Sequence, residues 1–258
     1  MFQPRTLLIL FFILLGSGCA TVQVPDEHDP FESFNRAAYA FNDDLDKALL
    51  KPLATGYQKV VPGAVNTSIS NFFSNLDDVI VLANDILQLK LEQTLSDFAR
   101  ITFNTTFGLA GLFDVATQMD LPKHSEDFGQ TLGRWGVASG PYLVLPFLGP
   151  STVRDGVALP VDWAVDPLYD IKDDNTRWGA IGLKVIDTRA GLLRASRILD
   201  TAALDPYTFM RDAYLQRRQN LVYDGNPPQS AIDNFDPFAE EFDPLADPGA
   251  PPSGESAP

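Results

Sequence analysis

Residues 29–50 read DPFESFNRAAYAFNDDLDKALL, and the spacing of their apolar side chains predicts an amphipathic helix. Asp29 can cap this helix, and Pro30 can occupy its first position, where no backbone N–H is needed. Lys51-Pro52 is expected to end it, because the residue before a proline disfavours helical geometry. The apolar residues recur every three or four positions and therefore share one face: Phe31, Phe34, Ala38, Phe41, Leu45 and Ala48.

Outward from this segment, helical spacing covers most of the chain up to residue 222. Apolar side chains recur at intervals of three and four within 62–76, 77–90, 91–108, 176–199 and 205–222. The alternation typical of half-buried strands is scarce. The sequence therefore predicts an all-α fold, with a single domain over residues 29–224.

Residues 128–150, FGQTLGRWGVASGPYLVLPFLGP, interrupt the helical pattern. Glycines are frequent in the first half, and prolines break the apolar run that follows. Proline cannot donate to a strand ladder or sit inside a helix, so we expect an irregular hairpin or loop. An apolar, glycine-rich loop suggests a functional role. The alternative is a buried connection beneath the helices.

The chain is acidic, with 19 Lys and Arg residues against 34 Asp and Glu residues and a formal net charge of -15. This balance argues against nucleic-acid binding, which relies on Lys and Arg displacing counterions from phosphates. It also argues against docking onto an anionic membrane through basic residues.

Residues that commonly carry catalysis or bind metals are few. One cysteine excludes an intramolecular disulfide and a cysteine metal cluster, and two histidines exclude a three-histidine metal site. No phosphate-binding loop, H-E-x-x-H or G-x-S-x-G motif occurs in the mature chain. His124 is expected to be an exposed loop residue. Three acidic pairs are expected to be solvated or to cap helices: Asp43-Asp44, Asp77-Asp78 and Asp173-Asp174.

Residues 1–18 read as a secretory signal peptide. Arg5 supplies the positive charge, residues 7–15 form an apolar run, and small residues follow it. The run is shorter than the ~20 apolar residues that a membrane-spanning helix needs. No later stretch of the chain holds 18 consecutive apolar residues.

Cys19 follows the small residues directly, which resembles the signal of bacterial lipoproteins, although Gly16 stands where such signals usually carry leucine. The resemblance implies cleavage before Cys19, lipid attached to it, and a lipidated tether over 19–28. Ala20 in the next position is similar to lipoproteins sorted to the outer membrane, on its periplasmic side. An ordinary cleaved signal with an incidental cysteine is the alternative.

Residues 225–258 are rich in Pro, Asp and Glu and contain no Lys or Arg. Such a segment buries too little apolar surface to offset the entropy of ordering it, so we expect a disordered acidic tail. The alternative is a short binding helix, because four apolar residues in the tail recur at helical spacing: Phe235, Phe238, Phe242 and Leu245.

Several longer motifs occur in one order and together resemble the MlaA/VacJ family of outer-membrane lipoproteins. They are DPFESFNRAAYAFND (29–43), LKPLATGY (50–57), SNFFSNLDD (70–78), ILQLK (86–90), FNTTFGLAGLFDVAT (103–117), DFGQTLGRWGVASGPYLVLPFLGPSTVRD (127–155) and DTRAGLL (187–193). The resemblance covers about 29–224 and leaves only the tail outside.

The resemblance implies a ring of helices lying in the inner leaflet around an amphipathic channel. It implies removal of phospholipids misplaced in the outer leaflet, association with trimeric porins, and transfer of lipid to a soluble periplasmic carrier of the Mla system. It also implies no enzymatic activity and no cofactor. A porin-binding structural adaptor lipoprotein without a lipid path of its own is the alternative function; a phospholipase at the same membrane would need a nucleophile that the sequence does not supply.

The resemblance also suggests which residues line the lipid path or form a gating loop beside it. Arg154 is a possible headgroup contact, since arginine binds phosphate bidentately, and an ion pair or cap is its structural alternative. Arg36 could also contact a headgroup, but a structural role in an ion pair or cap is favoured for it. Trp135 suits either a membrane interface or a core. The path or loop residues are Phe41, Gly136, Gly140, Pro141, Tyr142, Leu143, Leu145, Pro146, Phe147 and Gly149, with core burial as the alternative for Phe41.

Overall fold

The computed structural model describes residues 29–228, except for the side chains of residues 198–202. The predicted signal peptide at 1–18, Cys19 with the tether at 19–28, and residues 229–258 of the predicted tail lie outside the described residues. In chain order the elements are α2 (Glu32–Leu45), η1 (Asp46–Leu50), α3 (Lys51–Val60), α4 (Gly63–Leu87), α5 (Leu91–Thr106), η2 (Thr117–Met119), α6 (Phe128–Arg134), β1 (Tyr142–Leu145), β2 (Gly149–Thr152), α7 (Val153–Val165), η3 (Pro167–Asp170), α8 (Asp174–Ala202) and α9 (Pro206–Val222).

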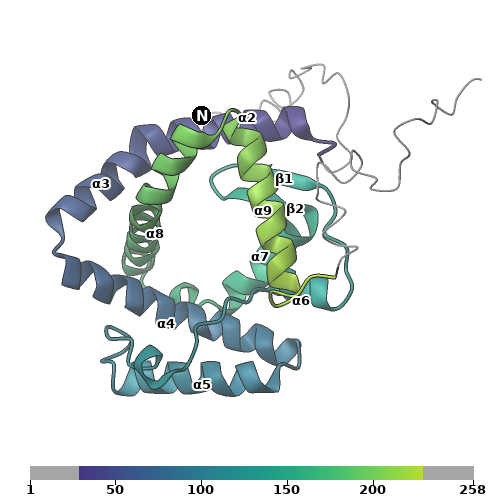
Figure 1. The fold of residues 1–258 in the computed structure, drawn as a ribbon. Helices are drawn as coiled ribbons and strands as arrows, with labels where there is room; N and C mark the ends of the chain where they lie inside the picture. The colour runs from purple at the N-terminus through teal and green to yellow at the C-terminus, as the bar shows by residue number, and fades with distance from the viewer. Residues whose placement is uncertain (1–28, 229–258) are drawn as a thin grey trace, which may run out of the picture.

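The helices follow one another in a ring (Figure 1). α2 and α3 form one side of this ring and α4 the opposite side, while α8 and α9 run between them. α5 packs against α4 on the outside of the ring. The predicted all-α, ring-like fold is confirmed, and strands within 29–228 are limited to one short hairpin.

The first helix does not end at Lys51-Pro52, so that prediction is wrong. A π-turn, η1, precedes the proline, and the Lys51 N–H donates to the Asp46 carbonyl five residues back. Leu50 and Lys51 keep helical backbone angles, and α3 continues to Val60. A proline removes one helical donor and crowds the preceding turn, and the wider π-turn relieves both constraints without ending the helix.

The predicted cap of the first helix is also wrong. The helix begins at Glu32, and Asp29 makes no side-chain cap. The Asp29 carboxylate is buried instead, where it accepts hydrogen bonds from Asn35 Nδ2 (2.7 Å) and from the Tyr207 hydroxyl. Asp29 therefore joins α2 to α9 instead of closing the end of its own helix.

The segment expected to be an irregular hairpin or loop is more regular than predicted. It opens with α6, which Asp127 caps by accepting the Gln130 N–H at 2.9 Å. The hairpin itself is confirmed: β1 and β2 are antiparallel, with Tyr142 opposite Thr152 and Leu145 opposite Gly149. Its turn places Phe147 at φ +67° and Gly149 at φ +89°. α7 follows directly and had no helical signal in the sequence analysis.

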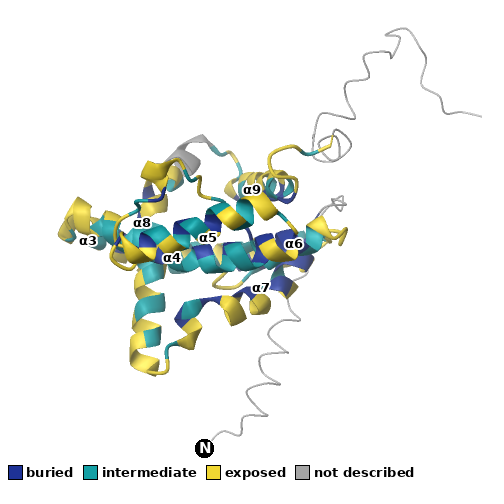
Figure 2. Cartoon of the chain, turned by 90° about the horizontal axis from the view of Figure 1, so that it is seen from below, coloured by how far each residue is buried: buried dark blue, intermediate teal, exposed yellow. Residues whose placement is uncertain are grey.

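Burial in this ring runs opposite to that of an ordinary globular domain. Among the described residues, the buried polar and charged side chains outnumber the buried apolar ones, and the apolar ones form two small clusters. Figure 2 shows buried positions scattered along the helices, with no single centre. Large apolar side chains are exposed on α5 and on the segment that follows it: Leu91, Leu95, Phe98, Phe107, Leu109 and Phe113. Within residues 29–228, no helix combines the length and apolar character needed to span a membrane.

Polar contacts join neighbouring helices of the ring. The buried Asp187 of α8 accepts three hydrogen bonds, from Tyr57 of α3 (2.9 Å) and from Asn66 (3.1 Å) and Ser70 (2.8 Å) of α4. One carboxylate therefore holds three helices together. Asp46 of η1 adds a second link to α8 by accepting two hydrogen bonds from Arg189, at 2.6 and 2.7 Å.

Replacing Asp187 with alanine is expected to lower the free energy of unfolding by about 3 kcal/mol, because three donors lose a charged acceptor. Thermal unfolding of the detergent-solubilised protein, followed by circular dichroism, measures the effect. Thr188→Ala is the control, because Thr188 is an exposed neighbour on the same helix. Equal midpoints for the two variants would show that Asp187 does not hold the helices together.

Candidate functional site

Three pockets follow one another along the inner side of the ring. The α4 pocket, about 470 Å³, is lined by α4, α8 and residues 123–127. The α7 pocket, about 270 Å³, lies between the hairpin, α7 and α9, and it shares Asp127 and Asp162 with the α4 pocket. The hairpin pocket, about 310 Å³, lies between α2, the hairpin and α8, and it shares Pro150 with the α7 pocket. The shared residues show that neighbouring pockets adjoin one another, and we call the three together the path.

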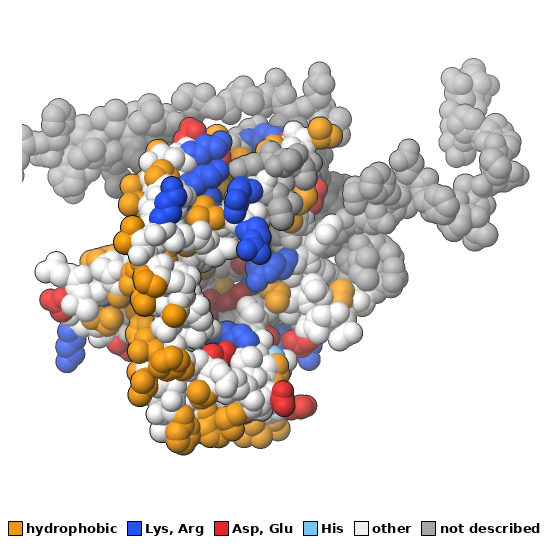
Figure 3. Space-filling view, turned by 60° about the vertical axis from the view of Figure 1, so that its left-hand side comes forward, with side chains coloured by type: hydrophobic (Ala, Val, Ile, Leu, Met, Phe, Trp, Pro, Cys, Tyr) orange, Lys and Arg blue, Asp and Glu red, His pale blue; other side chains and the backbone are white. Residues whose placement is uncertain are grey.

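The pockets combine charged side chains of both signs with apolar surface, so the path is amphipathic. In the α4 pocket, Lys184 pairs with Asp77, and Lys123 pairs with the buried Asp78 behind the wall. Figure 3 shows acidic and basic side chains within the central recess and apolar side chains along the outer edge of the ring. No group of three or more His, Cys, Asp or Glu side chains in residues 29–228 is arranged to hold a metal ion. This arrangement would let a polar or charged group move along the pockets. The outer edge of the ring, in contrast, is apolar.

The hairpin is attached to α2 by two asparagines seven residues apart. Asn35 donates to the Tyr142 carbonyl (3.0 Å) and accepts the Val144 N–H (2.8 Å). Asn42 repeats this pattern at the tip, where it donates to the Leu145 carbonyl (3.0 Å) and accepts the Phe147 N–H (2.7 Å). The two amides therefore pair with β1 and the turn as a neighbouring strand would. Asn42 was missed in the sequence analysis, although its two-turn spacing from Asn35 on one helix face is a detectable signal.

The structure brings some of the predicted path residues together and separates others. Phe41 and Phe147 meet edge to face at the hairpin tip, with ring centroids 5.1 Å apart, and both side chains are largely exposed. Tyr142 is buried in the cluster with Ala38 and Tyr207, and it also lines the hairpin pocket. Leu143, Pro141, Leu145 and Gly149 are half-buried along the hairpin, whereas Pro146, Gly136 and Gly140 are exposed.

Gly136 and Gly140 occupy the left-handed region, at φ +90° and +68°, on either side of residues 137–139. Glycine adopts this conformation without the steric cost that other residues bear. The two positions therefore set the course of the loop that leads from α6 to the hairpin. They do not line the three pockets of the path.

Arg154 lies in a buried ion-pair network instead of on the path. Its Nε donates to Asp155 Oδ1 (2.9 Å), and Asp155 also accepts from Arg218 and Tyr214. Arg218 binds Asp127 through both Nη atoms, which links α9 to α6 and α7. Burial alone would raise the pKa of Asp127, but the hydrogen bonds and charge of Arg218 outweigh it and lower that pKa.

Arg36 has the structural role that the sequence analysis favoured. It pairs with Asp205 at 2.7 Å and lies over the Tyr207 ring, 4.3 Å from its centroid. Trp135 is 55% exposed and donates to the Leu87 carbonyl at 3.2 Å, so it is not a core residue.

Two expectations for polar loop and helix residues are wrong. His124 is mostly buried, with Nδ1 2.8 Å from Asp97 Oδ2. Asp78, expected to be solvated, is fully buried and pairs with Lys123 and, at 3.6 Å, with Arg100. Both lie where α4, α5 and residues 121–127 meet, a junction that a single-helix pattern does not reveal.

A pair of buried carboxyl groups occupies the same junction. Asp85 of α4 and Asp97 of α5 are both fully buried, and neither Asp85 oxygen accepts a hydrogen bond from the described residues. Burial, together with the neighbouring Asp97, raises the pKa of Asp85 to about 8. The Asp85 carboxyl group is therefore largely protonated at neutral pH, which reduces its repulsion with Asp97.

Comparison with known proteins places these features in a family context. The model of a family described as MlaA lipoprotein matches residues 27–221. An uncharacterized protein of Rickettsia felis is 36% identical over 207 residues, which cover 80% of each chain. The intermembrane phospholipid transport system lipoprotein MlaA of Shigella flexneri is 36% identical over 234 residues, covering 85% of this chain and 91% of that protein.

A solved structure shares the fold as well as the sequence. It comes from work on the structural basis for maintenance of bacterial outer membrane lipid asymmetry. Its TM-score is 0.66 at 34% identity, and the match covers 77% of this chain and 99% of that one.

The stability of the α4–α5 junction is expected to fall as pH rises, because of Asp85. An unfolded Asp titrates near 3.8, so between pH 3.8 and about 8 the folded chain holds a proton that the unfolded chain has released. The contribution of this group is complete below pH 3.8 and is lost as pH rises through about 8. Asp85→Asn is therefore expected to flatten the decline of the melting temperature between pH 5 and 8. Asp44→Asn, at an exposed position, should follow the wild-type profile.

Replacing Asn42 with alanine is expected to loosen the hairpin tip while the ring stays folded. Loss of the acceptor for the Phe147 N–H should make that amide exchange with deuterium about five- to tenfold faster, since one hydrogen bond contributes roughly 1 kcal/mol. Exchange of the Val144 amide, which Asn35 holds, should change less. Asp44→Ala is the control on the same helix, and unchanged exchange at Phe147 would contradict the role given to Asn42.

Proposed function

Because the chain belongs to the MlaA lipoprotein family, we propose that it transports phospholipids between membranes and so maintains the lipid asymmetry of the outer membrane. The observation that carries the proposal is the reversed burial of the ring, with charged groups of both signs in adjoining pockets and large apolar side chains exposed on α5. A bilayer leaflet can surround such a ring without leaving its apolar surface in water.

A phospholipid that leaves its leaflet must move a polar headgroup past hydrocarbon, which is costly without polar partners. The α4, α7 and hairpin pockets offer charged and hydrogen-bonding groups to that headgroup, while the tails stay in the surrounding lipid. No covalent bond changes in this process. The proposed protein is therefore a passive conduit, and the headgroup path is the site of its activity.

The proposal includes the place of the protein in the envelope. Lipid on Cys19 anchors it to the periplasmic side of the outer membrane, and phospholipid misplaced in the outer leaflet enters the ring. A trimeric porin holds the protein in position, and a soluble periplasmic carrier of the Mla system receives the lipid. The apolar outer surface of α5 supports this position, since it would lie against lipid or against an apolar partner.

The hairpin is proposed to control access to the path. The Phe41–Phe147 contact closes its tip onto α2, and only side-chain amides tie that tip to the helix. Phe41, Phe147, Leu143 and Leu145 are the predicted path residues placed to touch acyl chains, and Tyr142 lines the hairpin pocket from its buried position.

A double substitution inside the α4 pocket tests the path. Ser74→Leu with Thr188→Leu adds apolar bulk to its lining and removes no side-chain hydrogen bond or ion pair among the described residues. In cells that lack the native protein, this variant should accumulate phospholipid in the outer leaflet, measured by its accessibility to an outer-leaflet modifying enzyme. Protein level and porin co-purification should stay normal.

Thr102→Leu with Thr106→Leu is the control, because both lie on α5 and line none of the three pockets. It should leave surface phospholipid at the wild-type level. If the pocket variant also behaves as wild type, the chain has no lipid path there. A normal level of surface phospholipid together with loss of porin co-purification would instead favour a porin-binding structural adaptor.

A further inference from the structure

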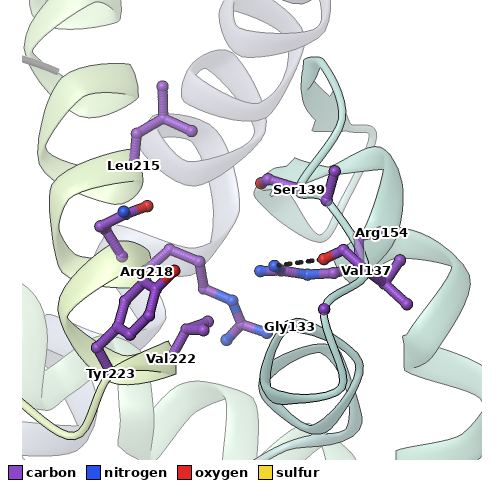
Figure 4. A pocket seen from close by; sticks show the side chains of 11 residues that line it. Gly133, Val137, Ser139, Arg154, Leu215, Arg218, Val222 and Tyr223 are labelled. Atoms are coloured by element: carbon purple, nitrogen blue, oxygen red, sulfur yellow. Dashed lines mark hydrogen bonds between the residues drawn. The ribbon is translucent and has the colours of Figure 1, made fainter. Parts of the chain in front are cut away.

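A fourth pocket, the arginine pocket, lies apart from the lipid path. It is about 190 Å³ and sits between α9 and the segment that leads from α6 to the hairpin (Figure 4). Arg218 is the one residue that it shares with the α7 pocket, and it shares none with the other two. The arginine pocket therefore adjoins the α7 pocket at Arg218, and the rest of its lining lies off the path.

The charge of the arginine pocket differs from that of the path. Its lining includes Arg154 and Arg218 but no Asp or Glu, whereas the α4, α7 and hairpin pockets of the described residues each include acidic side chains. Asp127 and Asp155, which pair with these arginines, line the α7 pocket instead. The buried network thus presents carboxylates to the path and guanidinium groups to the arginine pocket.

Arg154 keeps unused hydrogen-bond donors on the pocket side. Its side chain is more than nine-tenths buried, and it donates to Asp155 Oδ1 at 2.9 Å and to the Val137 carbonyl at 3.4 Å. A guanidinium carries five N–H donors, and the others have no acceptor among residues 29–228. Figure 4 shows this guanidinium directed into the space between the loop and α9. A buried cation with spare donors favours an anionic acceptor.

The walls of the pocket leave this cation accessible. A Cβ at Gly133 would lie 2.7 Å from Arg154 Nη1, so any larger residue there would displace the guanidinium. Ser139 and Gln219 line the same space and add neutral hydrogen-bonding groups. The volume is below the roughly 300–1,000 Å³ typical of sites for drug-sized ligands, and it therefore suits one small polar group.

We propose that the arginine pocket binds the phosphate group of a phospholipid headgroup, with Arg154 as its main contact. This assignment rests on the proposed function, which supplies phospholipid as the ligand. A phosphodiester carries a single negative charge, and the pocket offers it the spare donors of Arg154 within a lining that holds no Asp or Glu. A free phosphate ion carries nearly twice that charge and shares the same donor chemistry. The exposed Trp135 and Val137 beside the pocket fit an apolar surrounding better than an aqueous one.

A charge change of matched shape tests the site. Gln219→Glu places a carboxylate in the lining with almost no change in volume, and Asn220→Asp makes the same charge change one residue on, at an exposed position outside the lining. The full chain in detergent is titrated by calorimetry with glycerophosphoethanolamine, a phosphodiester headgroup without acyl chains, and separately with inorganic phosphate. Glycerol serves as the uncharged probe.

The wild type and Asn220→Asp should bind glycerophosphoethanolamine alike, and Gln219→Glu should bind it about tenfold more weakly because of like-charge repulsion. Glycerol should not bind. Equal binding by Gln219→Glu and the wild type would overturn the site, as would no binding by any form. Binding of inorganic phosphate with rejection of the diester would overturn the lipid assignment.

The outcome is independent of the test of the path. If the pocket binds the diester as expected while Ser74→Leu with Thr188→Leu leaves surface phospholipid normal, the site stands and the proposed path fails. If surface phospholipid accumulates in that variant while Gln219→Glu binds the diester normally, the path stands and the site fails.

Discussion

Buried apolar side chains of the described ring form two small clusters, so no central apolar core holds the fold together. Each helix must instead be joined to its neighbours through side chains within a thin wall. Asp187 joins α3, α4 and α8, and Arg218 joins α9 to α6 and α7. Removing one partner from a buried charged pair costs about 3–5 kcal/mol, whereas an apolar replacement of the whole pair can be neutral. An apolar replacement here would place apolar surface on the path, so the requirement for a polar interior accounts for the ionic joints.

The hairpin is joined to the ring by a weaker kind of contact. Asn35 and Asn42 are neutral amides, and each provides one donor and one acceptor to the hairpin backbone. Neutral hydrogen bonds contribute less than those to charged groups. Asn35 is fully buried, but Asn42 at the tip is not, and the aromatic contact beside it is exposed. The tip is therefore the part of this region that can open at the smallest cost in free energy, which suits a segment that controls access.

The amphipathic helices were predictable because periodicity reports which residues share a face. Periodicity does not report what that face meets, and Phe31, Phe34 and Phe41 are exposed although they follow the spacing of a core stripe. Polar residues were harder to predict for the same reason. Asp78 and Asp85 lie on α4 and become buried only because α5 folds back against it.

Local signals also failed where distant contacts outweighed them. Pro52 suggested a helix end, and a π-turn removed the conflict. Arg154 was assigned two roles, and the structure connects them: one edge of its guanidinium pairs with Asp155 and the other is open to a pocket. The pairing depends on α6, α7 and α9 coming together, which no single segment encodes.

The charges along the path bear on how a conduit releases what it binds. Several of its lysines and arginines already have acidic partners, such as Asp77 for Lys184 and Asp46 for Arg189. A zwitterionic headgroup that enters exchanges one ion pair for another of similar strength, so no position along the path holds it much more tightly than the next. Conduction requires this balance, because a site must bind well enough to admit its cargo and weakly enough to let it leave. The unpaired donors of Arg154 lie off the path, where a tighter contact with phosphate does not arrest movement along it.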